Sequence, residues 1–131
     1  MTTGPGRVPP SDLSAEKAVL SAILLDNAVI HTLATEICEE DFYHPAHQSL
    51  YAAMIRLKDD TQPVDLTTLA AYLQAHDLFE MVGGALALAE IADYEATPSN
   101  ALYYAKIVRD HSVKRNVISV GSEIVGLGYD Q

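Results

Sequence analysis

Residues 97–128 decide the fold of this chain, and they read TPSNALYYAKIVRDHSVKRNVISVGSEIVGLG. Thr97-Pro98 is a strong helix-start signal, because Thr is a good N-cap and Pro is favoured at the first helical position. No helix breaker follows until Gly126-Leu127-Gly128, so the pattern predicts one helix of about 30 residues, or roughly 45 Å. A body of about 100 residues has a radius of gyration of only about 13 Å. The last helix is therefore expected to project beyond the body.

The apolar face of this predicted helix changes along its length. At about 100° per residue, one side of its first part carries the apolar residues Ala101, Tyr104, Ile107 and Val108. After His111 the apolar residues follow the 4-3-4-3 spacing of a coiled-coil seam, on the side opposite the first set. We call this set the seam; it comprises Val113, Val117, Val120, Ile124 and Leu127. The pattern predicts a helix that packs on its own body up to about residue 111 and presents the seam as an interface beyond it. The alternative is that the seam covers this chain's own core.

The rest of the chain predicts a compact helical bundle. Residues 1–12 are rich in Pro, Gly and Thr and are expected to form a disordered arm. Apolar residues then recur at helical spacing, which predicts a globular body over residues 13–97, followed by the long helix over 98–131. No segment shows sustained period-two alternation. The expected fold is therefore all-α, a compact bundle of about five or six helices ending in one long projecting helix.

Local signals divide the body into its helices. Ser14, His44 and Asp65 are the predicted N-caps, and Pro45 follows His44 at a first helical position. Gly83-Gly84 is predicted to be a turn before the fifth helix. The expected core residues, chosen by helical spacing, are Leu20, Ile23, Leu24, Phe42, Tyr43, Leu50, Tyr51, Met54, Leu69, Leu73 and Val108.

Composition narrows the classes of partner. The chain has 18 acidic and 8 basic residues among 131, a net charge of −10, which disfavours tight autonomous binding to nucleic acid or to anionic membranes. Half of the basic residues, Lys106, Arg109, Lys114 and Arg115, fall in one window of the last helix, but they project in several directions. A solvated helix surface is the favoured interpretation. The single cysteine, Cys38, and an N-terminus without the features of a signal peptide predict a cytoplasmic protein.

The sequence contains none of the common catalytic motifs. A phosphate-binding loop needs a Gly-Lys pair, which is absent, and neither G-x-S-x-G nor H-E-x-x-H occurs. Cys38, His44 and His47 match no standard zinc spacing. Residues 39–41, Glu-Glu-Asp, are expected to be a solvated run. We therefore expect no catalytic, cofactor or metal site in this chain.

The chain resembles the N-terminal domain of bacterial replicative DNA helicases of the DnaB type over roughly residues 13–129. The order and spacing of several blocks carry the resemblance: Glu16-x-x-Val19-Leu20-x-x-Ile23-Leu24; Asp41-Phe42-Tyr43 with His47, Leu50, Tyr51 and Met54; Pro63-Val64-Asp65 with Leu69 and Leu73; Gly83-Gly84; and Asn100-Ala101-x-x-Tyr104-Ala105-x-Ile107-Val108-Arg109 with Arg115. Ala87 departs from the family, which often has Tyr there.

The resemblance implies a function through partners. In this family the domain is joined to a motor domain that binds ATP and Mg²⁺ and acts as an ATP-dependent DNA helicase. The N-terminal domains form a collar on the hexamer as a trimer of dimers, and a helical hairpin mediates pairing and helps to recruit primase; a helicase loader is a further possible partner. The projecting half of the last helix would then be the first arm of an incomplete dimerisation hairpin, and the chain itself would be non-catalytic.

Two other classes of function stay open from the sequence. One is a free-standing helical regulator that binds DNA through residues 106–115, the segment that contains the four clustered cations. The other is a small hydrolase with a His/Asp site that matches no standard motif. Salt-sensitive DNA binding would support the first, and hydrolytic activity without a motor domain would support the second.

Overall fold

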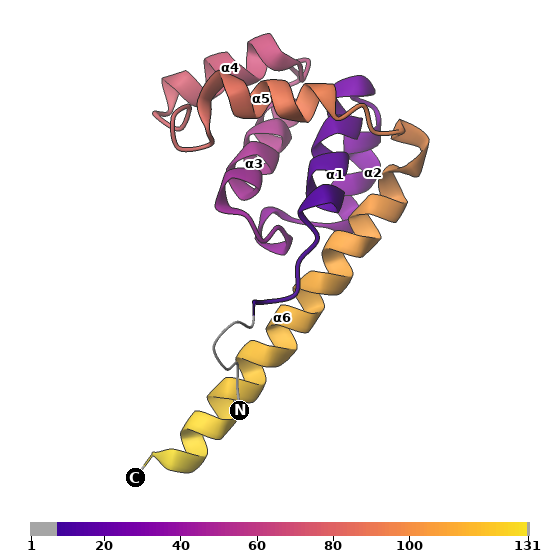
Figure 1. Cartoon of the computed structure of the whole chain (residues 1–131). Coiled ribbons are helices and arrows are strands. Elements are labelled where there is room, and N and C mark those ends of the chain that lie inside the picture. The colour runs from indigo at the N-terminus through magenta and orange to yellow at the C-terminus, as the bar shows by residue number, and fades with distance from the viewer. Residues whose placement is uncertain (1–7, 131) are drawn as a thin grey trace.

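The computed structural model describes residues 8–130, and within that range the secondary structure is entirely helical (Figure 1). The helices are α1 (Leu13–Leu25), α2 (Val29–Glu36), η1 (Glu39–Asp41), α3 (Pro45–Asp59), α4 (Leu66–Ala75), α5 (Gly84–Asp93), η2 (Pro98–Asn100) and α6 (Ala101–Tyr129), where η marks a 3-10 helix. Helices α1 to α5 form the body, and α6 packs on it with its first part and then projects away (Figure 1). The predicted all-α fold with one long projecting helix is confirmed.

Helix α1 lies at the centre of the body, where it contacts α2, α3, α5 and α6. Its residues from Val19 to Ile23 are all buried, because other helices cover it on several sides. The prediction that Ser14 caps this helix is wrong: the N-cap is Asp12, whose Oδ1 accepts a hydrogen bond from the Ala15 N–H at 2.9 Å. Leu13 is already helical, so the cap lies two residues earlier than the pattern suggested.

The predicted caps of α3 and α4 and the glycine turn are confirmed. His44 Nδ1 accepts a hydrogen bond from the Ala46 N–H at 3.0 Å, and Pro45 occupies the first helical position of α3. Asp65 Oδ1 accepts from the Thr68 N–H at 2.8 Å. Gly83 has a φ of 108°, and a Cβ there would lie 2.7 Å from the Ala87 Cβ. Only glycine satisfies both the backbone conformation and the space at this turn.

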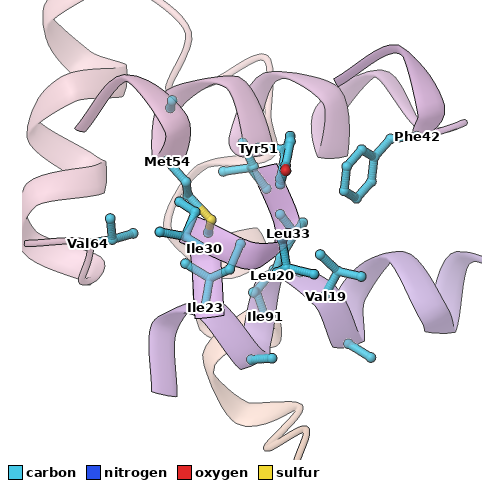
Figure 2. Close-up of a cluster of buried hydrophobic side chains, with 14 of the residues drawn as sticks. Val19, Leu20, Ile23, Ile30, Leu33, Phe42, Tyr51, Met54, Val64 and Ile91 are labelled. Carbon is cyan, nitrogen blue, oxygen red and sulfur yellow. The ribbon is translucent and has the colours of Figure 1, made fainter. Parts of the chain in front are cut away.

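The core contains residues from all six α-helices, and Figure 2 shows part of it, a cluster of apolar side chains from α1, α2, α3 and α5. The predicted core residues are buried, with two exceptions: Leu24 is only partly buried at the edge of the core, and Tyr43 is exposed. Phe42 and Tyr51 contact each other with ring centroids 4.9 Å apart. The Tyr51 hydroxyl donates a hydrogen bond to the Ile37 carbonyl at 3.1 Å, so its polar end is satisfied inside the core.

The start of the long helix differs from the prediction. Residues 98–100 form a 3-10 turn, the Thr97 side chain makes no capping hydrogen bond, and α6 begins at Ala101. Helix α6 then continues through the glycines at 121, 126 and 128 and ends at Tyr129, a length of 29 residues or about 44 Å.

The side of α6 that packs on the body is also different from the predicted one. Ala101, Ala105, Val108 and Ser112 are the buried residues of this helix. Tyr104 is only half-buried and Ile107 is exposed, so the packing face is rotated away from them toward Ala105. Small side chains at 101, 105 and 112 allow α6 to lie close to α1.

Part of the predicted N-terminal arm, residues 1–7, lies outside the described residues. The rest of that predicted arm, residues 8–12, passes alongside α6 near its midpoint before α1 begins (Figure 1). The Pro10 carbonyl accepts a hydrogen bond from Arg115 there, at 2.8 Å.

Candidate partner-binding surface

The five seam residues lie on the projecting part of α6 and are all exposed. Their exposed fractions range from 45 % at Val113 to 71 % at Leu127. The last buried residue of α6 is Ser112, directly before the seam begins. Within residues 8–130 the seam therefore covers none of the core, and the alternative in which it does so is wrong. A row of large apolar side chains in water is a feature that usually marks an interface.

The seam lies opposite the predicted apolar face of α6, but not opposite the face that is buried. At about 100° per residue, the seam is centred roughly 110° from the buried face, because that face is rotated relative to the predicted one. A further pair of exposed apolar side chains, Ile118 and Val125, lies roughly 130° beyond the seam. The distal half of α6 thus carries apolar side chains in two directions, and only one of them was predicted. The seven-residue spacing of Ile118 and Val125 is the signal that could have revealed the second direction.

Two of the four clustered cations of α6 bind backbone carbonyls of other segments. Arg109 Nη1 donates a hydrogen bond to the Glu36 carbonyl at 3.1 Å, and Arg115 donates to two other backbone carbonyls. Lys106 and Lys114 are exposed and lie on different sides of the helix. Two of the four positive groups are therefore engaged within the chain, which weakens the DNA-binding alternative.

Arg115 connects three segments of the chain at the point where α6 leaves the body. Its Nη1 donates to the Pro10 carbonyl at 2.8 Å and its Nη2 donates to the Asp41 carbonyl at 2.7 Å. The guanidinium also lies over the Tyr43 ring, 5.4 Å from its centroid. One turn earlier, the Ser112 hydroxyl donates to Asp41 Oδ1 at 2.8 Å. We call these five residues the Arg115 cluster. The predictions of a solvated surface at Arg115 and of a solvated run at Asp41 are wrong.

A second polar cluster is buried between α1 and the start of α3. Glu16 is 2 % exposed, and its carboxylate accepts hydrogen bonds from the Tyr43 N–H at 2.6 Å and the His44 N–H at 3.3 Å. Its Oε1 also lies 2.7 Å from His47 Nδ1, in a buried pair. Burial would raise the pKa of Glu16, but the hydrogen bonds from His47 and the two backbone amides outweigh it and hold that pKa below its ordinary value.

The Glu16 cluster is a structural support for the loop before α3. Three donors converge on one carboxylate, so the cluster fixes the backbone at Tyr43 and His44 and orients His47. The neighbouring hollow of about 250 Å³ between α1, α3 and α5 is lined by Lys17, His44, Glu90 and apolar side chains. Partial burial and then the neighbouring His47 lower the pKa of His44. Charges of both signs line this hollow, so it offers no clear preference for one class of ligand.

Cys38 and the nearby histidines do not meet in a metal site. No group of three or more potential ligands suited to a metal ion occurs among residues 8–130. The pKa of the Cys38 thiol is raised by partial burial and by the carboxylates of Glu40 and Asp41, which disfavours the thiolate. In the described part of the chain, no helix has the length and apolar character needed to cross a bilayer.

Comparison with known proteins places these features in a family. The sequence model for the DnaB-like helicase N terminal domain matches residues 8–110, which end just before the seam. The replicative DNA helicase DnaB of Geobacillus stearothermophilus is 42 % identical over 123 residues, which are 94 % of this chain and 27 % of that protein. The chain thus spans about a quarter of the length of this relative.

Two solved structures resemble the fold closely. The N-terminal domain of DnaB helicase from Mycobacterium tuberculosis has a TM-score of 0.91 and 36 % identity, covering 95 % of this chain and 90 % of that one. A DnaB-like replicative helicase, described together with its interactions with primase, has a TM-score of 0.75 and 28 % identity, covering 88 % of this chain and 27 % of that one. The long final helix is part of the aligned region in the first case, because only one-twentieth of this chain is left out.

Proposed function

We propose, from the premise that this chain belongs to the family of DnaB-like helicase N-terminal domains, that it is the oligomerisation and partner-docking domain of a replicative DNA helicase. In that role it would form part of the collar of a hexamer that acts in the initiation and elongation of DNA replication. The observation that carries the proposal is the exposed seam on a helix that projects from a compact body. The body would supply a rigid base, and the seam would supply the contact.

The physical argument for pairing starts from the exposed apolar side chains. Full burial of a Val, Leu or Ile side chain contributes about 1.5–3 kcal/mol, so covering the five seam residues is a substantial driving force. A two-heptad helix is marginal alone in water. Apolar side chains in two directions, the seam and the pair Ile118 and Val125, indicate that more than one helix packs against the distal half. A second hairpin arm and a second copy of the domain would satisfy both directions.

The catalytic function would belong to the rest of the helicase. We infer that ATP and Mg²⁺ bind a motor domain that follows this one, and that this domain is non-catalytic and binds neither. Primase is the proposed partner beyond self-association, since a structural relative is described with its interactions with primase, and a helicase loader is a further candidate. A replicative helicase of this kind acts in the cytoplasm, with no requirement for a membrane.

The test of pairing compares two charge substitutions in a protein that also contains the second hairpin arm. Val117→Asp places a charge in the seam, where burial without a partner is costly, and is expected to abolish self-association in sedimentation equilibrium. Ser119→Asp adds the same charge two residues away, outside the seam, and is expected to leave association unchanged. Both variants should keep the thermal melt of the body. Unchanged pairing in Val117→Asp, or unfolding of its body, would contradict the proposal.

The test of partner docking uses primase itself. A protein with the complete hairpin is expected to bind primase more tightly than the 131-residue chain, because the chain contains only the first proposed arm. A fluorescence titration with labelled primase measures both affinities. Equal affinities would show that docking does not need the second arm and would place the primase surface on the body or on the first arm.

A further inference from the structure

We propose that Arg115 is a positioning residue that fixes the direction in which the projecting half of α6 leaves the body, and so aligns the seam with its partner. The alignment part of this inference rests on the proposed pairing function; the direction of the helix does not. The inference is carried by the Arg115 cluster, which lies where α6 leaves the body: Arg115 is partly buried, and every residue of α6 after it is exposed.

The contacts of Arg115 approach one guanidinium from two separate segments. The Pro10 carbonyl belongs to the segment before α1, and the Asp41 carbonyl belongs to the last residue of η1, shortly before α3; the two bonds are 2.8 and 2.7 Å long. The Tyr43 ring adds a cation–π contact at 5.4 Å. A planar guanidinium with fixed donors holds both segments in one geometry, which a lysine ammonium on a flexible stem does not reproduce.

Both segments that Arg115 contacts are firmly attached to the body. Phe42, between Asp41 and Tyr43, is 1 % exposed in the core, and its carbonyl accepts a hydrogen bond from Gln48 Nε2 at 2.7 Å. The Tyr43 N–H donates to the buried Glu16 carboxylate. On the other segment, Asp12 caps α1 only two residues after Pro10. Arg115 is thus bound to two fixed points, and its contacts resist tilting of α6.

The Arg115 cluster lies at the base of the projecting half, so a small tilt of α6 there displaces the seam. Fourteen residues of α6 follow Arg115, up to Tyr129, which is about 21 Å of helix. A tilt of about 10° at the cluster would move the tip by roughly 4 Å, close to half of the 8–10 Å that separates two packed helices. Such a sideways displacement would separate the side chains of two paired helices near the tip. A direction fixed at residue 115 is therefore a condition for the seams of two copies to meet along their length.

The direct test measures the direction of α6 within one chain. Spin labels are placed at Gln74 on α4 and at Ser119 on α6, two exposed positions outside the seam, after Cys38→Ser removes the native thiol. Serine at 38 keeps a donor toward Asp41. The unsubstituted cluster should give a single narrow distance distribution, whereas Arg115→Ala and Arg115→Lys should each shift and broaden it. Lys114→Ala removes the neighbouring exposed cation and should leave the distribution unchanged.

A milder variant covers the case in which Arg115→Ala disturbs folding. Ser112→Ala removes only the hydroxyl bond to Asp41, with little change in volume, and should broaden the same distribution by less than Arg115→Ala. Circular dichroism melts show whether the body of each variant is intact. If both folded variants keep the narrow distribution of the unsubstituted cluster, the inference is wrong.

The consequence for pairing is measured on the protein with the second hairpin arm. Arg115→Ala, with every seam residue intact, should raise the dissociation constant of self-association about tenfold, and Lys114→Ala should not change it. If the unsubstituted protein does not self-associate, the proposed function fails, and the label distances alone still decide the positioning role. If it pairs and Arg115→Ala pairs equally well, the alignment role fails while the proposed function stands.

Discussion

The two halves of α6 belong to one continuous helix but have opposite relations to the rest of the molecule. From Ala101 to Ser112 the helix buries a narrow face of small residues and Val108 against the body. From Val113 to Tyr129 the larger Val, Ile and Leu side chains are all exposed. The first half thus has one face buried against the body, whereas the distal half has no buried side chain in the described chain. Apolar spacing therefore predicts that a helix face packs against another surface. Only the position of the body shows whether that surface belongs to the same chain.

The sharpest way to break this comparison is to place the same charge in each half. Val108→Asp buries an unpaired carboxylate in the core and is expected to lower the free energy of unfolding by about 3–5 kcal/mol. Val117→Asp places it on an exposed side chain and should leave the free energy of unfolding of the body nearly unchanged. Urea denaturation of both variants measures the difference. Similar losses in the two variants would mean that the distal half also stabilises the body.

Truncation of one leucine in each region is a milder form of the same comparison. Leu69→Ala, in the core contact between α4 and the body, should lower the free energy of unfolding by about 2–5 kcal/mol, since the side chain is fully buried. Leu127→Ala should have no measurable effect on the body, because that side chain is 71 % exposed. Thermal melts compare the two. A loss below about 0.5 kcal/mol for Leu69→Ala would contradict the burial of α4 against the core.

Acid should destabilise the body through Glu16. The pKa of Glu16 in the folded state lies below its ordinary value of 4.5, so its contribution to stability is present above that value and is lost as pH falls through the folded pKa. Glu16→Gln should flatten the pH dependence of the free energy of unfolding between about pH 5 and pH 3. Urea titrations across this range measure it. An equally steep acid loss in Glu16→Gln would assign the sensitivity to other carboxylates.

The smallest expected effect is confined to the distal half. A Cβ at Gly121 would meet nothing within 4 Å, and Ala has about 1 kcal/mol more helix propensity than Gly. Gly121→Ala should slow amide hydrogen exchange in the last turns of α6 about fivefold without changing exchange in α1. Slower exchange in α1 as well would show that the two halves of α6 unfold together with the body.

Local signals explain which parts of the fold were predictable. His44 with Pro45, and Asp65 with Thr68, act within three residues of each other, so their capping roles follow from the sequence. The sequence predicts Ser14 as the cap of α1 because serine is a good cap, but Asp12, two residues earlier, takes that role. Thr97-Pro98 predicts that α6 starts at Pro98. Residues 98–100 form a 3-10 helix instead, since Pro fits the first turn of either helix type and does not distinguish between them.

The contacts that were missed are long-range. No local pattern in the sequence predicts that Glu16 binds His47, because His47 is 31 residues away. The sequence pattern favours a solvated surface at Arg115, yet Arg115 binds the Pro10 carbonyl, 105 residues away. Helical spacing predicts which side chains share a face, but it carries no information on which distant backbone carbonyl that face meets. The exposure of the seam could be predicted, because the sequence gives the length of the last helix and that length exceeds the size of the body.

Because α6 runs unbroken from the body into its projecting half, the direction in which the seam faces around the helix axis is fixed relative to the body. One residue inserted after Asn116 would turn every later side chain by about 100° and bring a different sector of the helix to the partner. Seven inserted residues would return the seam to within about 20° of its original direction and only move it outward along the helix. The projecting half can therefore change in length by whole heptads with little rotation of the seam, whereas the insertion of one residue would turn the seam away from its partner.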